Sequence, residues 1–174
     1  MKRLLIVVDY QNDFVDGALG FVKAQEIENN IVDKIKEYQG RNDEIIFTLD
    51  THYDNYMSTK EGENLPVPHC IKGTKGHELY GKVKDLANGH FIIEKETFGS
   101  KELFKYLEDK EYSSIELIGV VTNICVISNV VIVKALHPNT EILVDASCSS
   151  SNDEDMEQKS LDILENLHIK IINR

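Results

Sequence analysis

The chain has 174 residues and a net charge of −11, with 30 acidic residues against 19 basic ones. This length fits one domain, which we expect to span residues 1–174, and it allows a buried core without disulfides. The acidic balance argues against binding to nucleic acids or anionic membranes, because phosphate groups would be repelled.

Membrane insertion and export are not expected from the sequence. No apolar run approaches the roughly 20 residues that a membrane-spanning helix needs, and the apolar run Leu4–Val8 is too short for the core of a signal peptide. The three cysteines, Cys70, Cys125 and Cys148, are widely spaced and form no Cys-x-x-Cys pair. They are typical of reduced thiols, so we expect a cytoplasmic protein.

Six short runs rich in Ile, Val and Leu recur along the chain and are nearly continuous rather than alternating. Strands that are covered on both faces have this pattern. The predicted strands are Arg3–Asp9, Glu44–Asp50, His90–Lys95, Ser114–Val120, Glu141–Asp145 and His168–Asn173.

Helical patterns lie between most of these runs. Apolar residues recur at about one helical turn in three segments, and a fourth, Thr122–Leu136, is apolar almost all round and predicts a buried helix. The three periodic sets are Ile27, Ile31, Ile35 and Tyr38; Leu103, Phe104 and Leu107; and Leu161, Leu164 and Leu167. Alternating strands and helices predict an α/β fold with a parallel, doubly wound sheet.

One long connection, residues 51–76, interrupts this alternation. It has little periodicity and carries Pro66, Pro68, several glycines and two of the six histidines. Long connections inside compact domains are usually functional or disordered. Its histidines, together with neighbouring acidic residues, favour a functional role.

Reactive side chains follow four of the predicted strands. Asp9, Asp50 and Lys95 close the first three, and Cys125 follows the fourth. Ligands of open parallel sheets bind beyond the carboxyl ends of the strands, so these side chains indicate a common site. Taken singly, Asp9 could be a cap, Lys95 an exposed turn residue and Cys125 a small core residue.

The chemistry of this set is that of a nucleophilic cysteine. Cys125 falls in the first turn of a predicted helix, where the helix N-terminus lowers the pKa of a thiol, and a neighbouring lysine acts in the same direction. Lys95 could hold a thiolate and a carboxylate together. Asp9 could take the cysteine proton and later deliver it to a leaving amine.

The long connection carries a second set of polar residues. Asp50 and His52 are two residues apart, so both can point to one side of an extended segment, and Glu61 and His69 follow. A set of carboxylates and histidines suits a divalent ion such as zinc, manganese or iron. The other four histidines lack such neighbours, and we expect them at the ends of elements or on the surface.

Five segments together carry a resemblance to a known family. They are Asp9–Phe14, Thr48–His52, Leu65–Cys70 with Gly73-Thr74, Lys95 with Phe98, and Gly119–Val126. The sequence resembles the isochorismatase-like cysteine hydrolases, and within them the nicotinamidase/pyrazinamidase branch. The resemblance implies a six-stranded parallel sheet with helices on both faces and a catalytic triad of Asp9, Lys95 and Cys125.

The resemblance also implies the parts that surround the triad. The Val120–Val121 peptide bond is expected to be cis, and the amides of Val121 and Cys125 to face the developing oxyanion. Asp50, His52 and His69 match metal ligands, with Glu61 as a fourth from its place in the connection. Phe14, Leu19 and Phe98 correspond to positions near an aromatic substrate ring.

The implied activity is hydrolysis of a heteroaromatic carboxamide through a thioester, in a protein that associates with copies of itself. Three departures concern the ring pocket: Asn123 where Asp is common, Gly99-Ser100-Lys101 after Phe98, and Leu65-Pro66 where some nicotinamidases have tryptophan. Two alternatives stay open, an amidase for N-carbamoyl or ureido substrates and a non-catalytic binding domain. Isochorismate hydrolysis is less favoured, because it does not call for metal ligands.

Overall fold

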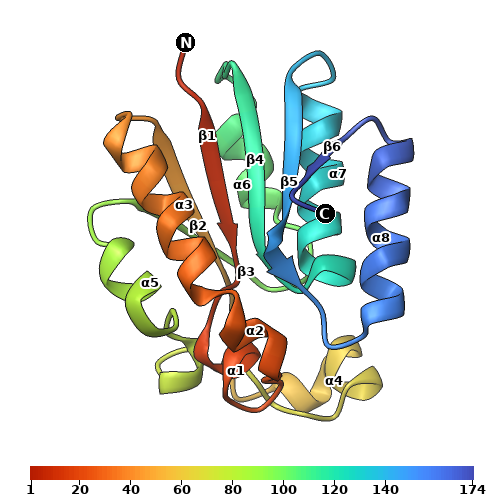
Figure 1. The fold of residues 1–174 in the computed structure, drawn as a ribbon. Helices are drawn as coiled ribbons and strands as arrows, with labels where there is room; N and C mark the ends of the chain where they lie inside the picture. Colours follow the sequence, from red (N-terminus) through yellow and green to blue (C-terminus); the bar gives the residue numbers. More distant parts are fainter.

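A computed structural model describes the whole chain, residues 1–174. All six predicted strands are present, and they form one parallel sheet in the order β3-β2-β1-β4-β5-β6 (Figure 1). The strands are β1 (Leu4–Val8), β2 (Glu44–Asp50), β3 (Phe91–Lys95), β4 (Ser114–Val120), β5 (Glu141–Ser150) and β6 (Lys170–Ile172). The predicted fold class is therefore confirmed.

Helices connect successive strands and cover both faces of the sheet. The helices are α1 (Asn12–Val15), α2 (Val22–Glu26), α3 (Glu28–Gly40), α4 (Lys60–Asn64), α5 (Gly81–Leu86), α6 (Lys101–Leu107), α7 (Ile127–Leu136) and α8 (Glu154–Asn166). Short 3₁₀ turns η1 (Tyr56–Ser58) and η2 (Lys75–His77) lie in the long connection, and η3 (Thr122–Val126) is a π turn.

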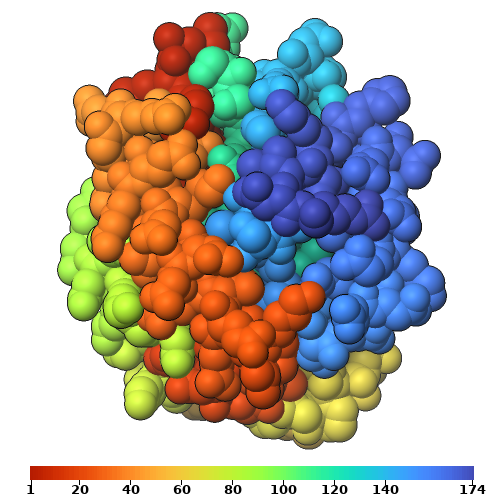
Figure 2. Space-filling view, in the orientation of Figure 1, coloured from red at the N-terminus to blue at the C-terminus, as the bar shows by residue number.

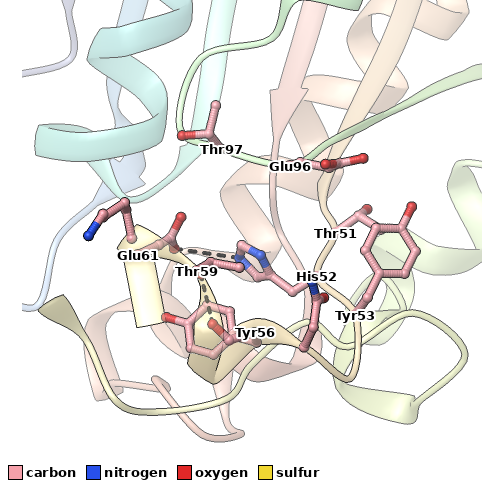
Figure 3. Close-up of a pocket in the computed structure, with 10 residues that line it drawn as sticks. Thr51, His52, Tyr53, Tyr56, Thr59, Glu61, Glu96 and Thr97 are labelled. Atoms are coloured by element: carbon pink, nitrogen blue, oxygen red, sulfur yellow. Dashed lines mark hydrogen bonds and ion pairs between the residues drawn. The ribbon is translucent and has the colours of Figure 1, made fainter. Parts of the chain in front are cut away.

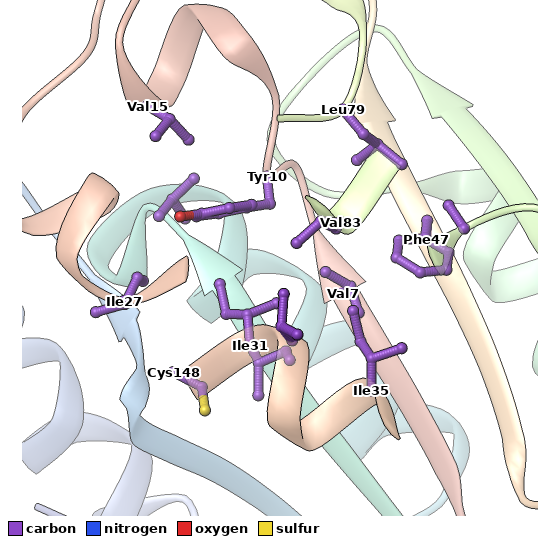
Figure 4. Packing of buried hydrophobic residues seen from close by; sticks show 14 of the residues in the cluster. Val7, Tyr10, Val15, Ile27, Ile31, Ile35, Phe47, Leu79, Val83 and Cys148 are labelled. Carbon is purple, nitrogen blue, oxygen red and sulfur yellow. The ribbon is translucent and has the colours of Figure 1, made fainter. Parts of the chain in front are cut away.

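Two apolar cores flank the sheet because alternate residues of each buried strand point to opposite faces. On one face, Val7 and Phe47 pack against Ile31 and Ile35 of α3 and Val83 of α5 (Figure 4). On the other face, alternate strand residues pack against α6, α7 and α8. Burial on both sides explains why the central strands are continuously apolar.

The carboxyl ends of the strands meet at one edge, the lower edge in Figure 1, beside α1, α2 and α4. On the face shown in Figure 2, the first third of the chain lies against the C-terminal third, and Lys23 of α2 forms a 2.7 Å ion pair with Glu157 of α8. The sheet order reverses between β1 and β4, and in such sheets the reversal point opens a crevice for ligands.

Some expectations about burial were wrong. Strand β3 lies at the edge of the sheet, so Phe91 and Ile92 are exposed rather than covered on both faces. The segment Thr122–Leu136 starts as the π turn η3 and turns one side outward, with Val131 exposed. Apolar residues occur on all sides of this segment, so the sequence did not show that one side faces solvent.

Within the chain, no helix is both long and apolar enough to cross a bilayer.

Candidate active site

Asp9 leaves strand β1 in a left-handed backbone conformation, with φ of 48°, and its side chain is fully buried. The hydroxyl of Thr48, on the neighbouring strand β2, donates a 2.7 Å hydrogen bond to Oδ1 of Asp9. Burial raises the pKa of Asp9, whereas the neighbouring charge of Lys95 lowers it. Asp9 is thus a buried carboxylate whose charge depends on one ammonium group.

Lys95, the last residue of β3, supplies that ammonium group. Its Nζ lies 2.6 Å from Oδ2 of Asp9, 3.3 Å from Oδ1 of Asp50 and 3.6 Å from Sγ of Cys125, and it also donates to the carbonyl of Thr97 at 3.1 Å. Burial opposes the charge of Lys95, but the surrounding groups, Asp9 first and then Cys125 and Asp50, together outweigh burial and raise the pKa of Lys95. The lysine therefore stays protonated and joins the three groups.

Cys125 lies in the π turn η3 that follows β4, and it is buried. Burial raises the pKa of its thiol well above the usual value, against the smaller lowering effect of Lys95. The expected lowering of the thiol pKa was wrong, because the cost of burying an anion exceeds the help from the turn and the lysine. The resting group is a neutral thiol, so it needs a base.

The turn that carries Cys125 starts at the Val120–Val121 peptide bond, which is cis as the resemblance implied. Gly119 precedes it with φ of 116°, and a Cβ at this position would lie 2.0 Å from the carbonyl oxygen of Val8. Only glycine allows β4 to pass so close to β1 at this point. The close approach brings the turn against the strand that leads to Asp9.

Four ligand-type side chains from the long connection and β2 form a compact cluster. One ligand atom from each of Asp50, His52, Glu61 and His69 lies within 4.8 Å of all the others. Nε2 of His52 is 2.9 Å from Oδ2 of Asp50 and 3.5 Å from Oε1 of Glu61. Burial lowers the pKa of His52, but the close contacts with these two carboxylates outweigh burial and raise the pKa to about 9.

The ring orientations in this cluster fit a bound cation. Nδ1 of His69 donates to the carbonyl of Val67 at 2.8 Å, which leaves the lone pair on Nε2 facing the cluster. Nε2 of His52 is buried and has no hydrogen-bond partner of good geometry. Second-nitrogen hydrogen bonds of this kind orient histidine ligands in metal sites. Two imidazoles and two carboxylates are a donor set suited to zinc, manganese or iron.

A cavity of about 360 Å³ joins the thiol to this cluster. The three residues expected near a substrate ring, Phe14, Leu19 and Phe98, all line it. The remaining lining residues are Gly20, Asp50, Glu61, Leu65, His69, Val121, Ile124, Cys125 and Asn152. One end is therefore apolar and aromatic, while the nucleophile and the cluster face the same space.

Three residues that hold the site together were not singled out from the sequence. Gln11 donates to the carbonyls of Asp50 and His77 and accepts from the amide of Asp50, which fixes the end of β2. Asp13 accepts a 2.7 Å hydrogen bond from the amide of Cys70 and so anchors the residue after His69. Both residues lie in the segment Asp9–Phe14, which carried the family resemblance, and this could have identified them.

Asn129 of α7 is the third such residue. Its amide nitrogen donates to the carbonyls of Phe98 and Cys125, and its amide oxygen accepts from the backbone of Ser100. A fully buried amide with every contact satisfied fixes two segments relative to each other. Asn129 thus sets the distance between the segment bearing Phe98 and the nucleophile.

Comparisons with known proteins agree with this geometry. The model of the Isochorismatase domain matches residues 3–173. The chain belongs to the isochorismatase family. An isochorismatase-family protein of Bacillus subtilis is 35% identical over 143 residues, which cover 75% of this chain and 78% of that protein.

Solved structures of the isochorismatase family have the same fold. The pyrazinamidase/nicotinamidase of Streptococcus mutans superposes with a TM-score of 0.87 and 30% identity, covering 98% of this chain and all of the other (100%). The pyrazinamidase of Pyrococcus horikoshii, solved in complex with zinc, gives a TM-score of 0.84 and 28% identity, covering 100% of both chains. The likeness extends over the whole length of each protein.

Proposed function

We propose that the chain is a cysteine amidohydrolase that converts nicotinamide, pyrazinamide or a close heteroaromatic carboxamide to the acid and ammonia. The observation that carries this proposal is one cavity that holds the Cys125 thiol, the apolar ring wall and the four-residue cluster together. A nicotinamidase needs these three parts in one space. Family membership and the nicotinamidase and pyrazinamidase names of the relatives support the same reaction class.

In the proposed first half-reaction, the carboxylate of Asp9 takes the thiol proton and the sulfur attacks the carboxamide carbon. The amides of Val121 and Cys125 stabilise the oxyanion of the tetrahedral intermediate. The carbon–nitrogen bond then breaks, the proton on Asp9 passes to the nitrogen, and ammonia leaves. Lys95 compensates the negative charge on Asp9 and on the sulfur during these transfers.

In the second half-reaction, water attacks the thioester while Asp9 accepts a proton from it. The carbon–sulfur bond breaks, the acid is released and the thiol regains its proton. Asp9 is suited to both roles, because burial raises its pKa and helps it to hold a proton, while Lys95 favours its charged form.

We assign Asp50, His52, Glu61 and His69 as the residues that hold a divalent ion. When bound, the ion supplies a Lewis-acid contact for a ring nitrogen or for the water beside it. Phe14, Leu19 and Phe98 hold the ring by apolar contact. The zinc named in the Pyrococcus horikoshii structure supports zinc as the first metal to test.

Release of ammonia from nicotinamide, pyrazinamide and several N-carbamoyl compounds, with and without chelator, tests the proposal. We expect the two heteroaromatic amides to be the best substrates and the chelator to reduce their turnover. Full activity on N-carbamoyl compounds without stoichiometric metal would instead establish the second amidase class. Absence of turnover on every amide would establish a binding domain.

We further propose a cytoplasmic protein that associates with copies of itself. All three cysteines are free and buried, which supports a reducing compartment. Exposed apolar side chains on α6 and α7, including Phe104 and Val131, support association. Sedimentation velocity measures the association directly, and a single species of 19.8 kDa would contradict it.

A further inference from the structure

A second cavity, of about 290 Å³, is lined by two members of the four-residue cluster, His52 and Glu61 (Figure 3). It lies between the segment from Thr51 to Glu61 and the loop that follows β3. Its lining residues are Thr51, His52, Tyr53, Asn55, Tyr56, Thr59, Lys60, Glu61, Glu96 and Thr97. None of the residues assigned to the substrate ring takes part in it, so it requires a separate explanation.

The four-residue cluster contributes side chains to the lining of both cavities. Asp50 and His69 face the substrate cavity, His52 faces the second cavity, and Glu61 lines both. Glu61 is also the most exposed of the four, with 16% of its side chain accessible, against 6% or less for the others. The cluster can therefore be reached from a side that a bound substrate does not cover.

The second cavity leads from solvent to His52 of the cluster. Tyr53, Asn55 and Glu96 at its mouth are exposed, whereas His52 at its floor is 95% buried, being 5% accessible. Nε2 of His52 is inaccessible and lies 2.9 Å from Oδ2 of Asp50. The passage therefore ends at a residue that belongs to the cluster.

The two cavities differ in chemistry. The substrate cavity is lined mainly by apolar side chains, whereas hydroxyl, amide and carboxylate groups dominate the second one. Its two carboxylates belong to Glu61 and Glu96. Lys60 is turned to solvent and paired with Glu63 at 2.7 Å, and His52 is paired with Asp50 and Glu61. Carboxylate and hydroxyl oxygens of this kind suit a hydrated divalent cation.

We propose that this second cavity is the passage through which the divalent ion enters and leaves the cluster, independently of the substrate cavity. The inference rests on the proposed metal site. Glu96 attracts the hydrated cation at the mouth, and Glu61 and His52 replace its water molecules at the floor. The ion can thus exchange while an aromatic amide occupies the space beside Cys125.

The test follows Zn²⁺ alone entering the full-length metal-free protein and leaving it to a colour-forming chelator. Asn55→Trp fills the mouth of the second cavity at a residue whose side chain makes no capping hydrogen bond. We expect entry and release each to slow at least about fivefold with an unchanged Kd, because a barrier on the path acts on both rates alike. Asn55→Ala removes the same amide without filling the space, so its rates of Zn²⁺ entry and release should equal those of the wild type.

Leu65→Trp is the matched variant on the substrate side, and we expect its Zn²⁺ rates to stay within about twofold of the wild type while its KM changes. Glu96→Gln should slow entry at low salt and lose this effect at high salt, because screening removes the attraction of an exposed carboxylate. Slower exchange in Leu65→Trp but not in Asn55→Trp would overturn the inference. Failure of the wild type to bind one Zn²⁺ at equilibrium would overturn the metal site itself, and the passage with it.

Discussion

The Nζ atom of Lys95 lies 3.3 Å from Oδ1 of Asp50, in addition to its 2.6 Å ion pair with Asp9. The two residues are paired in the register of β2 and β3, so the sheet itself fixes this contact. One buried ammonium group thus joins the proposed nucleophilic set to the proposed metal ligands. A change in either set is transmitted to the other through this charge.

Lys95→Met should therefore destabilise the fold as well as stop turnover. Removing one partner of a buried ion pair costs about 3–5 kcal/mol, because the remaining charge is left uncompensated. We expect the free energy of unfolding, measured with urea, to fall by this amount. The double variant Asp9→Asn/Lys95→Met should lose less than the sum of the two single variants. Strict additivity would show that the two groups do not interact.

Cys125→Ala should reduce amide hydrolysis by about 10³-fold or more, because the thioester cannot form. Cys148→Ala is the matched control, since Cys148 is also buried among apolar residues (Figure 4) but does not line the cavity. We expect the control to keep its kcat with a modest loss of stability. Ammonia release measures both variants, and residual activity near that of the wild type in Cys125→Ala would refute the covalent mechanism.

Glu61→Gln should weaken metal binding by about tenfold or more, because a ligand carboxylate is replaced by a neutral amide. Glu63→Gln, two residues along α4, is the control. Glu63 is absent from the cluster and pairs with the exposed Lys60. Metal content after dialysis against graded chelator distinguishes the two. Equal retention of metal by both variants would exclude Glu61 as a ligand.

The sequence predicted the sheet well, because each central strand is apolar on both faces and alternates with helical patterns. It predicted the residues at the strand ends for the same reason: parallel strands bring their carboxyl ends together. Burial at the sheet edge could not be predicted, since nothing in Phe91 or Ile92 reveals that β3 has only one neighbour.

The direction of the thiol pKa also depended on burial, which spacing along the chain does not give. The sequence placed Cys125 near a helix N-terminus, which favours a thiolate, but it did not show that the side chain is almost inaccessible to solvent. His77 ends η2 and His137 follows the end of α7, as expected for ends of elements. Both are buried, however, and His77 lies 2.8 Å from the hydroxyl of Thr51. Such contacts join segments far apart in the sequence, so local patterns carry no record of them.

Gly119→Ala should destabilise the fold by about 1–3 kcal/mol or more, because the added Cβ would meet the backbone of Val8 and φ is positive. Gly40→Ala, at the end of α3, offers a control with open space around the added methyl group. We expect this control to be neutral or slightly stabilising. Thermal unfolding measures the difference, and similar melting temperatures would contradict the close approach of β1 and β4.

Acid should destabilise the protein partly through Asp145, which lies outside the active site. Burial alone would raise the pKa of Asp145, but hydrogen bonds from Ser147 and Lys34 outweigh it and hold the pKa below 3.8. A lowered folded pKa means that this stabilisation is present above about pH 4 and is lost as the pH falls through the folded value.

Asp145→Asn should therefore be less stable than the wild type at pH 7, and the difference should shrink below pH 4. Urea unfolding at a series of pH values measures it. Asp155→Asn is the control, because Asp155 forms only an exposed pair with Lys159. If the free energy of unfolding of the wild type and of Asp145→Asn differed by the same amount at every pH, the lowered pKa of Asp145 would be contradicted.

The three hydrogen bonds of the Asn129 amide have a consequence for how this enzyme could change its preferences. Because one side chain holds both the backbone behind the sulfur and the backbone that presents Phe98, the reactive atom and the aromatic wall shift as a unit. Substitutions at the rim, such as those at Leu65 or Asn152, can therefore retune which amides are accepted while the alignment for attack is preserved.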